Sequence, residues 1–138
     1  TGGPPSPLAE GTFLSHGGRI LLDATGGGAS VTGTMSYIDT ANSADRFVVS
    51  LECARTTAGG LVAIGGPVTE STIDSEPKGG RVAIVLQPGS PVRAVIHTEG
   101  PDPAKATCQA FLETIPDVGD AAFMSVMEPI DGVIDLAP

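Results

Sequence analysis

The residues of this chain that could perform acid-base chemistry lie at the end of one predicted strand. His97 is followed by Thr98 and Glu99, and an imidazole beside a carboxylate can move a proton to or from a serine hydroxyl. The serines that could act with it are Ser15, Ser50 and Ser71. None of them lies in a Gly-x-Ser-x-Gly turn, which presents the nucleophile in a large class of hydrolases. We therefore predict no catalytic residues, and we interpret His97 as a surface histidine at a strand end.

Oxygen ligands for a hard cation are the second possible chemistry. Acidic and amide side chains gather in predicted loops, and Ca²⁺ binds several such oxygens. These residues are Asp39, Asn42, Asp45, Asp117, Asp120 and Asp131. Their spacing does not match the Asp-x-Asn-x-Asp-Gly pattern of a strong calcium motif, and Asp and Asn also build turns by bonding the backbone. We therefore predict turn-building residues, with calcium as the alternative, and neither a metal site nor another cofactor.

Cys53 and Cys108 are the only cysteines, so the chain can form a single disulfide. The chain has no Cys-x-x-Cys spacing of the kind that zinc sites and redox motifs use. A bridge across the long segment between the two cysteines would stabilise the fold by about 4 kcal/mol if it is unstrained. Two buried free thiols are the alternative. Because disulfides persist in oxidising compartments, the predicted bridge indicates a secreted, extracellular protein.

Composition limits both the fold class and the partners. The 138 residues fit a single domain, and 19 glycines with 12 prolines interrupt the chain too often for long helices. The net charge is −9, and the acidic residues are spread singly, which predicts a solvated acidic surface that repels nucleic acid. The apolar runs are far shorter than the roughly 20 residues of a membrane helix. We therefore expect neither a nucleic-acid partner nor membrane insertion.

The elements that must position these residues are short strands. Residues rich in β-branched side chains fill 47–55 and 61–71, and the turn-like 56–60 joins them into a hairpin. Strict alternation over 30–39 predicts one buried face and one exposed face. The continuous apolar run 81–87 is typical of a strand that is covered on both faces. Further strands are expected at 11–15, 19–24, 92–97, 122–127 and 132–136.

Together these patterns predict an all-β domain, a sandwich or flattened barrel of eight or nine mostly antiparallel strands. Residues 1–9 are expected to form a tail rich in Pro and Gly, and 10–138 the β domain. The alternation in 47–55 puts Cys53 on the core side, with Phe47, Val49 and Leu51. A helix is predicted only at 105–115, with Asp102 as its cap and Pro103 in its first turn, and an irregular segment is the alternative. The bridge would tie this segment to the sheet.

Glycines, strand patterns and the two cysteines also follow one another in a recognisable order. Gly33-x-x-x-Tyr37-x-Asp39 precedes the strand that ends in Cys53, and then come Ala63-Ile64-Gly65-Gly66-Pro67-Val68, Gly79-Gly80, Cys108 and Gly132-Val133-Ile134-Asp135. This order resembles a family of uncharacterised β-rich domains in secreted bacterial proteins, over most of residues 10–136. The resemblance implies a fold and no catalytic residues. Many relatives have an acidic loop after the central strand where this chain has Gln87-Pro88-Gly89-Ser90, so the resemblance implies no cation site there.

The function expected from these features is that of a non-enzymatic structural or interaction module outside the cell. Its partners would be other protein subunits or further copies of itself. Strands with unpaired edges associate readily, so the sharpest form of this hypothesis is a self-assembling fibre or surface subunit. In that form a neighbouring molecule would add a strand, and the extended first ten residues would supply it.

The alternative is a small β-barrel enzyme or carrier that binds an apolar ligand in its lumen. The residues that would line the lumen are Met35, Tyr37, Phe47, Phe123 and Met124, with His97 at the mouth. Ordinary core packing by the same side chains is the competing interpretation. A carbohydrate-binding role is disfavoured, because the chain has five aromatic residues and no Trp.

Overall fold

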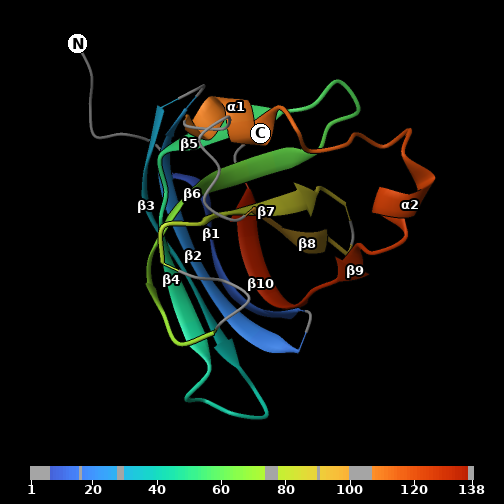
Figure 1. The fold of residues 1–138 in the computed structure, drawn as a ribbon. Coiled ribbons are helices and arrows are strands. Elements are labelled where there is room, and N and C mark those ends of the chain that lie inside the picture. Colours follow the sequence, from blue (N-terminus) through green and yellow to red (C-terminus); the bar gives the residue numbers. More distant parts are fainter. Residues whose placement is uncertain are drawn as a thin grey trace.

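The chain folds as ten antiparallel strands that curl into one flattened, nearly closed barrel (Figure 1). The computed structural model describes residues 7–15, 17–27, 30–73, 78–89, 91–99 and 107–136. The strands are β1 (Pro7–Ser15), β2 (Gly18–Gly27), β3 (Ser30–Asp39), β4 (Arg46–Ser50), β5 (Cys53–Thr56), β6 (Val62–Ser71), β7 (Arg81–Gln87), β8 (Arg93–Glu99), β9 (Glu128–Pro129) and β10 (Asp131–Leu136). Two short helices, α1 (Cys108–Leu112) and α2 (Ala121–Met124), follow β8. The predicted all-β class is confirmed.

The barrel has two walls, which we name by what lies on their outer faces. The open wall consists of β10, β1, β2, β3 and β4, and the capped wall of β5, β6, β7, β8 and β9. The two walls join where the second half of β6 pairs with β4. On the opposite side the chain crosses between them at Ile130, whose N–H donates to the Val92 carbonyl at 2.9 Å. A single short segment therefore belongs to both walls, first as β9 and then as β10.

The main core lies between the two walls. Successive side chains of a strand point to opposite faces, so every second residue of each strand points inward. Its largest fully buried members are Phe13, Ile20, Leu22, Met35, Ile64, Ile84 and Leu86. The predicted alternation of 30–39 is confirmed, because Val31 and Met35 are buried whereas Thr32 and Thr34 are exposed.

A second cluster lies on the outer face of the capped wall, beneath α1 and the segment that follows it. Its buried members are Cys53, Leu61, Ala63, Ala83, Val85, Val95, Phe111, Leu112, Ile115 and Met127. In β7, Val82 and Ile84 belong to the main core, whereas Ala83 and Val85 belong to this second cluster. The prediction that 81–87 is covered on both faces is therefore confirmed.

The prediction for the face of Cys53 is wrong. Phe47, Val49 and Leu51 point into the main core, but Cys53 points outward into the second cluster. The predicted strand 47–55 is broken after Ser50, where Leu51 N–H donates to Gly33 and the chain leaves β3 for β6, so the alternation does not continue. Gly66 allows this change of neighbours, because a Cβ there would collide with the Ser50 carbonyl oxygen.

The helices also differ from the predictions. α1 begins at Cys108, and the Thr107 hydroxyl caps it by accepting from Ala110 N–H at 3.1 Å. The predicted start at 105, Asp102 and Pro103 lie outside the described residues. The predicted strand 122–127 is wrong, because residues 121–124 form α2. Asp120 caps this helix, since its Oδ1 accepts from Phe123 N–H at 2.9 Å. None of the four helical residues is β-branched, so none of them disfavours a helix for that reason. Neither described helix is long and apolar enough to cross a membrane.

The start of the sheet lies earlier than predicted. β1 begins at Pro7, so the last residues of the expected tail 1–9 belong to the sheet. Ala9 pairs with Leu136 on one side and with Ala24 on the other. Residues 1–6 lie outside the described residues.

Candidate functional site

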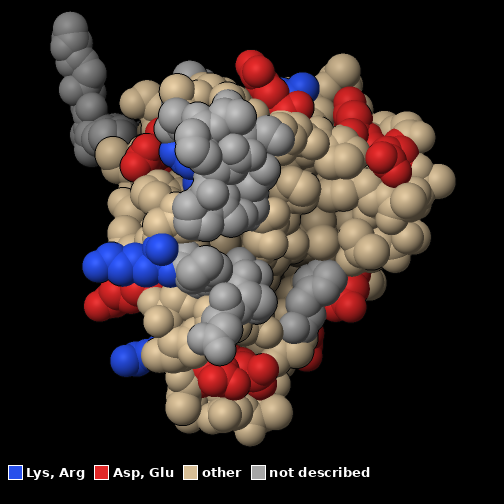
Figure 2. All heavy atoms as spheres, viewed as in Figure 1, with Lys and Arg blue, Asp and Glu red and all other residues tan. Residues whose placement is uncertain are grey.

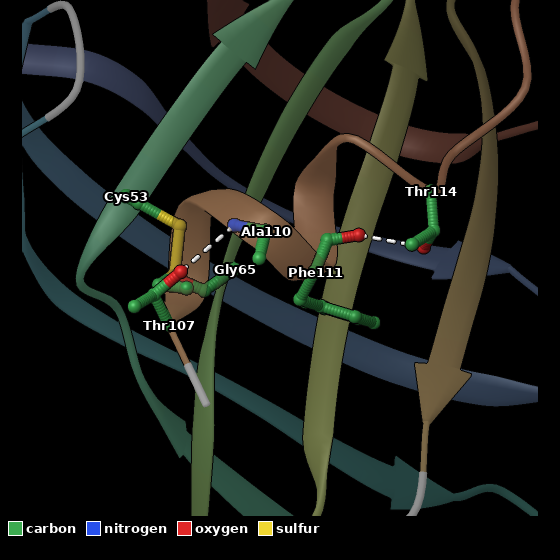
Figure 3. The surroundings of a disulfide bond; sticks show 7 residues. Cys53, Gly65, Thr107, Ala110, Phe111 and Thr114 are labelled. Carbon is green, nitrogen blue, oxygen red and sulfur yellow. Dashed lines mark hydrogen bonds between the residues drawn. A yellow bond between two sulfur atoms is a disulfide. The ribbon is translucent and has the colours of Figure 1, made fainter. Parts of the chain in front are cut away.

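A disulfide between Cys53 and Cys108 fixes α1 to the outer face of the capped wall (Figure 3). The predicted bridge is confirmed, and it joins β5 to the first residue of α1 with a Cα–Cα distance of 6.0 Å. The Gly65 carbonyl oxygen lies 3.3 Å from Cys108 Sγ, so the bridge lies directly over β6. We call residues 107–127, which cover this outer face, the cap, and it has a covalent attachment in addition to its apolar contacts.

His97 of β8 packs against this cap, and it is half-buried rather than exposed. Its ring stacks on Phe111 with the centroids 5.7 Å apart, and it meets Phe123 edge to face at 6.4 Å. Two of the serines that could have acted with it, Ser15 and Ser50, belong to the open wall. The hydroxyl of the third, Ser71, bonds both backbone groups of Ile73. The structure does not bring His97 and these serines together as a catalytic group.

The acidic side chains in the described loops build turns. Asp39 Oδ1 accepts from the N–H groups of Ala41 and Asn42, at 2.7 and 3.2 Å. Asn42 Oδ1 in turn accepts from Ala44 N–H at 3.1 Å. Among the described residues, no group of three or more His, Cys, Asp or Glu side chains is arranged to hold a metal ion. These loop residues therefore hold the chain in its turns.

Asp117 fastens the loop after α1 to the hairpin between β5 and β6. Its carboxylate accepts from the Thr57 hydroxyl at 2.6 Å, from Gly59 N–H at 2.9 Å and from Val118 N–H at 2.8 Å. The Thr57 bond is the largest of the causes that lower the pKa of the Asp117 carboxyl, followed by the Val118 bond. A lowered pKa means that the folded protein prefers the ionised form. Asp117 therefore contributes to holding the cap in place.

The six residues proposed to line an apolar lumen lie on both sides of the capped wall. They are Met35, Tyr37, Phe47, His97, Phe123 and Met124. The first three belong to or pack against the main core, where Tyr37 stacks on Phe47 with the ring centroids 5.2 Å apart. The last three lie at the second cluster, outside the barrel. They therefore do not line a common cavity. Burial, and then the charge of Asp39, raise the pKa of the Tyr37 hydroxyl.

Exposed apolar side chains gather instead on the outer face of the open wall. Leu14, Leu21 and Val133 are 38%, 42% and 69% exposed, and they come from β1, β2 and β10. Thr12 pairs with Leu21 on one side and with Val133 on the other, and Leu14 is two positions further along β1 on the same face. We call Val133, Thr12 and Leu21 the apolar row. With Leu14 beside it, this row forms the most apolar part of the face.

Charged residues flank the apolar row on both sides. On one side, the acidic row consists of Asp135, Glu10 and Asp23, which pair across β10, β1 and β2. On the other side, the arginine row consists of Asp131, Leu14, Arg19, Ile38 and Arg46, which pair from β10 across to β4. Like charges directly opposite one another destabilise a sheet. The acidic row is therefore an unfavourable arrangement for an isolated surface.

Three shallow hollows lie along this face or at its margin. The largest has a volume of about 380 Å³, and its lining includes Thr12, Leu21 and Asp23. A second, of about 230 Å³, includes Arg19 and Ile38, and a third, of about 250 Å³, includes Arg46 and Val48. The face is therefore uneven, with recesses that can receive side chains of a partner.

The amino-acid sequence contains a signal for this face that the predictions above do not use. Each of the three strands carries two large apolar residues in succession: Phe13-Leu14, Leu21-Leu22 and Val133-Ile134. Because neighbouring residues of a strand point to opposite faces, such a pair must place one member outside the core. Whether the outward members meet depends on the register of three strands, two of which are far apart in the sequence.

Comparison with known proteins gives no further information about the site. The chain matches no protein-family model, no characterised protein and no solved structure. The resemblance to secreted bacterial domains stays a prediction. Function is therefore inferred from the two outer faces of the barrel.

Proposed function

We propose that this protein is an extracellular, non-enzymatic interaction module that binds another protein through the outer face of its open wall. The observation that carries the proposal is the contiguity of Leu14, Leu21 and Val133, which are exposed side by side on three neighbouring strands. Apolar surface is stabilised by about 25 cal/mol for each Å² removed from water. Contiguous exposed apolar side chains with a charged rim are typical of protein-binding surfaces.

The outer face of the capped wall is already covered by the protein itself. Phe111 and Leu112 of α1 are fully buried against it, and the disulfide holds them there. A partner could reach the wall beneath only by displacing this cap. The open wall has no described helix on its outer face, so its apolar row is accessible without a rearrangement.

Association through a face is also favoured over the addition of a strand at an edge. β9 and β10 are the end strands of the sheet order. β9 contains Pro129, which has no N–H to donate, and β10 carries Asp131 and Asp135, so both edges have features that oppose pairing with another strand. Residues 7–10 of the expected donor segment are paired within β1 already. A fibre joined by strand addition therefore stays a prediction. The residues at these two edges do not favour it.

The extracellular location is supported by the disulfide, because disulfides persist in oxidising compartments. Figure 2 shows acidic side chains in separate places over the visible face, as expected for a well-solvated surface. The location predicts that the protein from its native source has both cysteines oxidised. A maleimide reagent should therefore modify Cys53 and Cys108 only after reduction under denaturing conditions. Modification of the unreduced protein would contradict the extracellular assignment.

A photo-crosslinking amino acid at position 21 tests the binding face. Val118 provides a matched control, because it is also 42% exposed but lies in the cap, between α1 and α2, rather than on the open wall. In the native host, we expect protein adducts from position 21 and few or none from position 118. Equal labelling from both positions, or no adduct from position 21, would refute the proposed face.

A further inference from the structure

The geometry points to a second copy of this chain as the occupant of the open wall, with a two-fold axis that runs along the apolar row. We make this proposal as an extension of the proposed function, because it names the partner of the same face. It rests on the order of the three rows, which are acidic, apolar and arginine-containing. On β2, where Asp23 and Arg19 lie on opposite sides of Leu21, that order is complementary to itself when one copy is turned over onto another.

The two-fold arrangement follows from positions on β2. Asp23 and Arg19 lie on the same face of β2, two positions on either side of Leu21. A two-fold axis that lies between the two faces and runs across the strands at Leu21 reverses the strand direction of the second copy. Each Leu21 then meets the other Leu21, and Asp23 of each copy meets Arg19 of the other. Such a contact is isologous, so it closes as a dimer.

The same two residues cannot satisfy each other within one chain. Four positions of an extended strand span about 13 Å, which is well beyond the reach of an ion pair. Asp23 lies instead beside Glu10 on β1, which pairs with Asp135 on β10, so three carboxylates adjoin. A neighbouring copy would bring Arg19 over Asp23, while its Leu14 would lie over Glu10. The dimer therefore provides the cation that the acidic row lacks among its cross-strand neighbours.

The size of the face indicates how strong this association is. Five strands about 4.8 Å apart and three rows about 6.6 Å apart cover roughly 500 Å² per copy. The total of about 1,000 Å² is near the lower limit for a specific interface. Asp131 of one copy would also approach Asp135 of the other at the solvated rim, and the net charge of −9 opposes association. We therefore expect a reversible dimer with a dissociation constant in the micromolar range.

Charge reversal tests the arrangement by sedimentation velocity at physiological ionic strength. R19D and D23R each place like charges opposite one another across the axis, so each variant should dimerise at least tenfold more weakly than the parent. The double variant R19D/D23R restores opposite charges at both contacts and should return to within about threefold of the parent. A mixture of the two single variants should form a heterodimer, since one offers two acidic groups and the other two basic groups. Their net charges are −11 and −7, two below and two above the parent's −9, so general attraction cannot explain a heterodimer.

The controls separate the dimer from folding and from the proposed function. L21R puts two cations together at the axis and should abolish dimerisation, whereas V118R, at an equally exposed position, should not change it. Circular dichroism must show the same fold for every variant that is compared. A parent protein that stays monomeric at 1 mM, or a mixture of R19D and D23R that does not associate, would overturn the second-copy proposal. Crosslinking from position 21 to a different protein would then show that the proposed function holds with another partner.

Discussion

The outer face of the capped wall is buried and that of the open wall is exposed, although both walls are antiparallel sheets that share one core. On the capped wall, Ala83 and Val85 of β7 point outward and are fully buried by the segment after β8. On the open wall, Leu21 points outward in the same way and stays exposed. The difference lies in what later parts of the chain supply. One face receives two helices and a disulfide from residues 107–127, and no described helix covers the other face.

Removing the Phe111 side chain from the cap should lower the free energy of unfolding more than any other change considered. Phe111 is fully buried, so Phe111→Ala should lower the free energy of unfolding by about 3 to 5 kcal/mol. Leu21→Ala on the open wall should change it by no more than about 0.5 kcal/mol. Urea denaturation of both variants, at a concentration well below the expected dissociation constant so that association contributes little, measures the difference. Similar losses from the two variants would show that the two faces do not differ in the way we describe.

Removal of the disulfide should have the next largest effect, and it should act on the capped wall. The bridge closes a separation of 55 residues, and Cys53→Ser with Cys108→Ser should cost about 2 to 4 kcal/mol. Native-state hydrogen exchange should then report faster opening in α1 than in β2. The parent protein under reducing conditions serves as the control, because it lacks the bridge but keeps the sequence. Equal acceleration in both elements would mean that the bridge stabilises the whole barrel rather than its cap.

The same substitution, Val→Thr, can be made at a buried position of one face and at an exposed position of the other. Val85→Thr places a hydroxyl in the buried second cluster and should cost about 1 to 3 kcal/mol, because a buried hydroxyl without a partner is penalised. Val133→Thr makes the same change at a residue that is 69% exposed, and it should alter stability by less than about 0.5 kcal/mol. Thermal unfolding of the two variants is sufficient to separate them. A larger loss for Val133→Thr would indicate that this residue is covered in solution even in the monomer.

Neutralising the Asp117 carboxylate should change stability less than the substitutions above. Because folding lowers its pKa, its contribution is fully present above the ordinary value of 3.8 and is lost as the pH falls through the folded-state pKa. Asp117→Asn should therefore lower stability at pH 7 and make it less dependent on pH below 4. Denaturation curves between pH 2 and pH 7 measure this, with Asp120→Asn as the matched control, because it removes a carboxylate charge but keeps a side chain that can cap the helix. Parallel curves for the parent and Asp117→Asn would contradict the role of the Thr57 bond.

Local patterns predict much of this fold. Alternation defines 30–39, a continuous apolar run defines 81–87, and turn residues join β5 to β6, because each of these signals acts over a few neighbouring residues. The outward position of Cys53 could not be predicted in this way, since it depends on Gly66 in a different strand. The apolar segment 122–127 fits a strand as well as a helix, and the Asp120 cap decides between them. The rows of the open wall depend on the register of β10 against β1.

The pairing of β1 with β10 also determines the order in which the protein can be completed. Phe13 pairs with Gly132, more than a hundred residues later, so during synthesis β1 has an unpaired edge until β10 has emerged. By contrast, β1 to β4 of the open wall and β6 to β8 of the capped wall pair in the order in which they are made. Contacts between distant residues form slowly, so the pairing of β1 with β10 should form last. The free edge of β1 should therefore stay open to other strands until the last strand of the chain has paired with it.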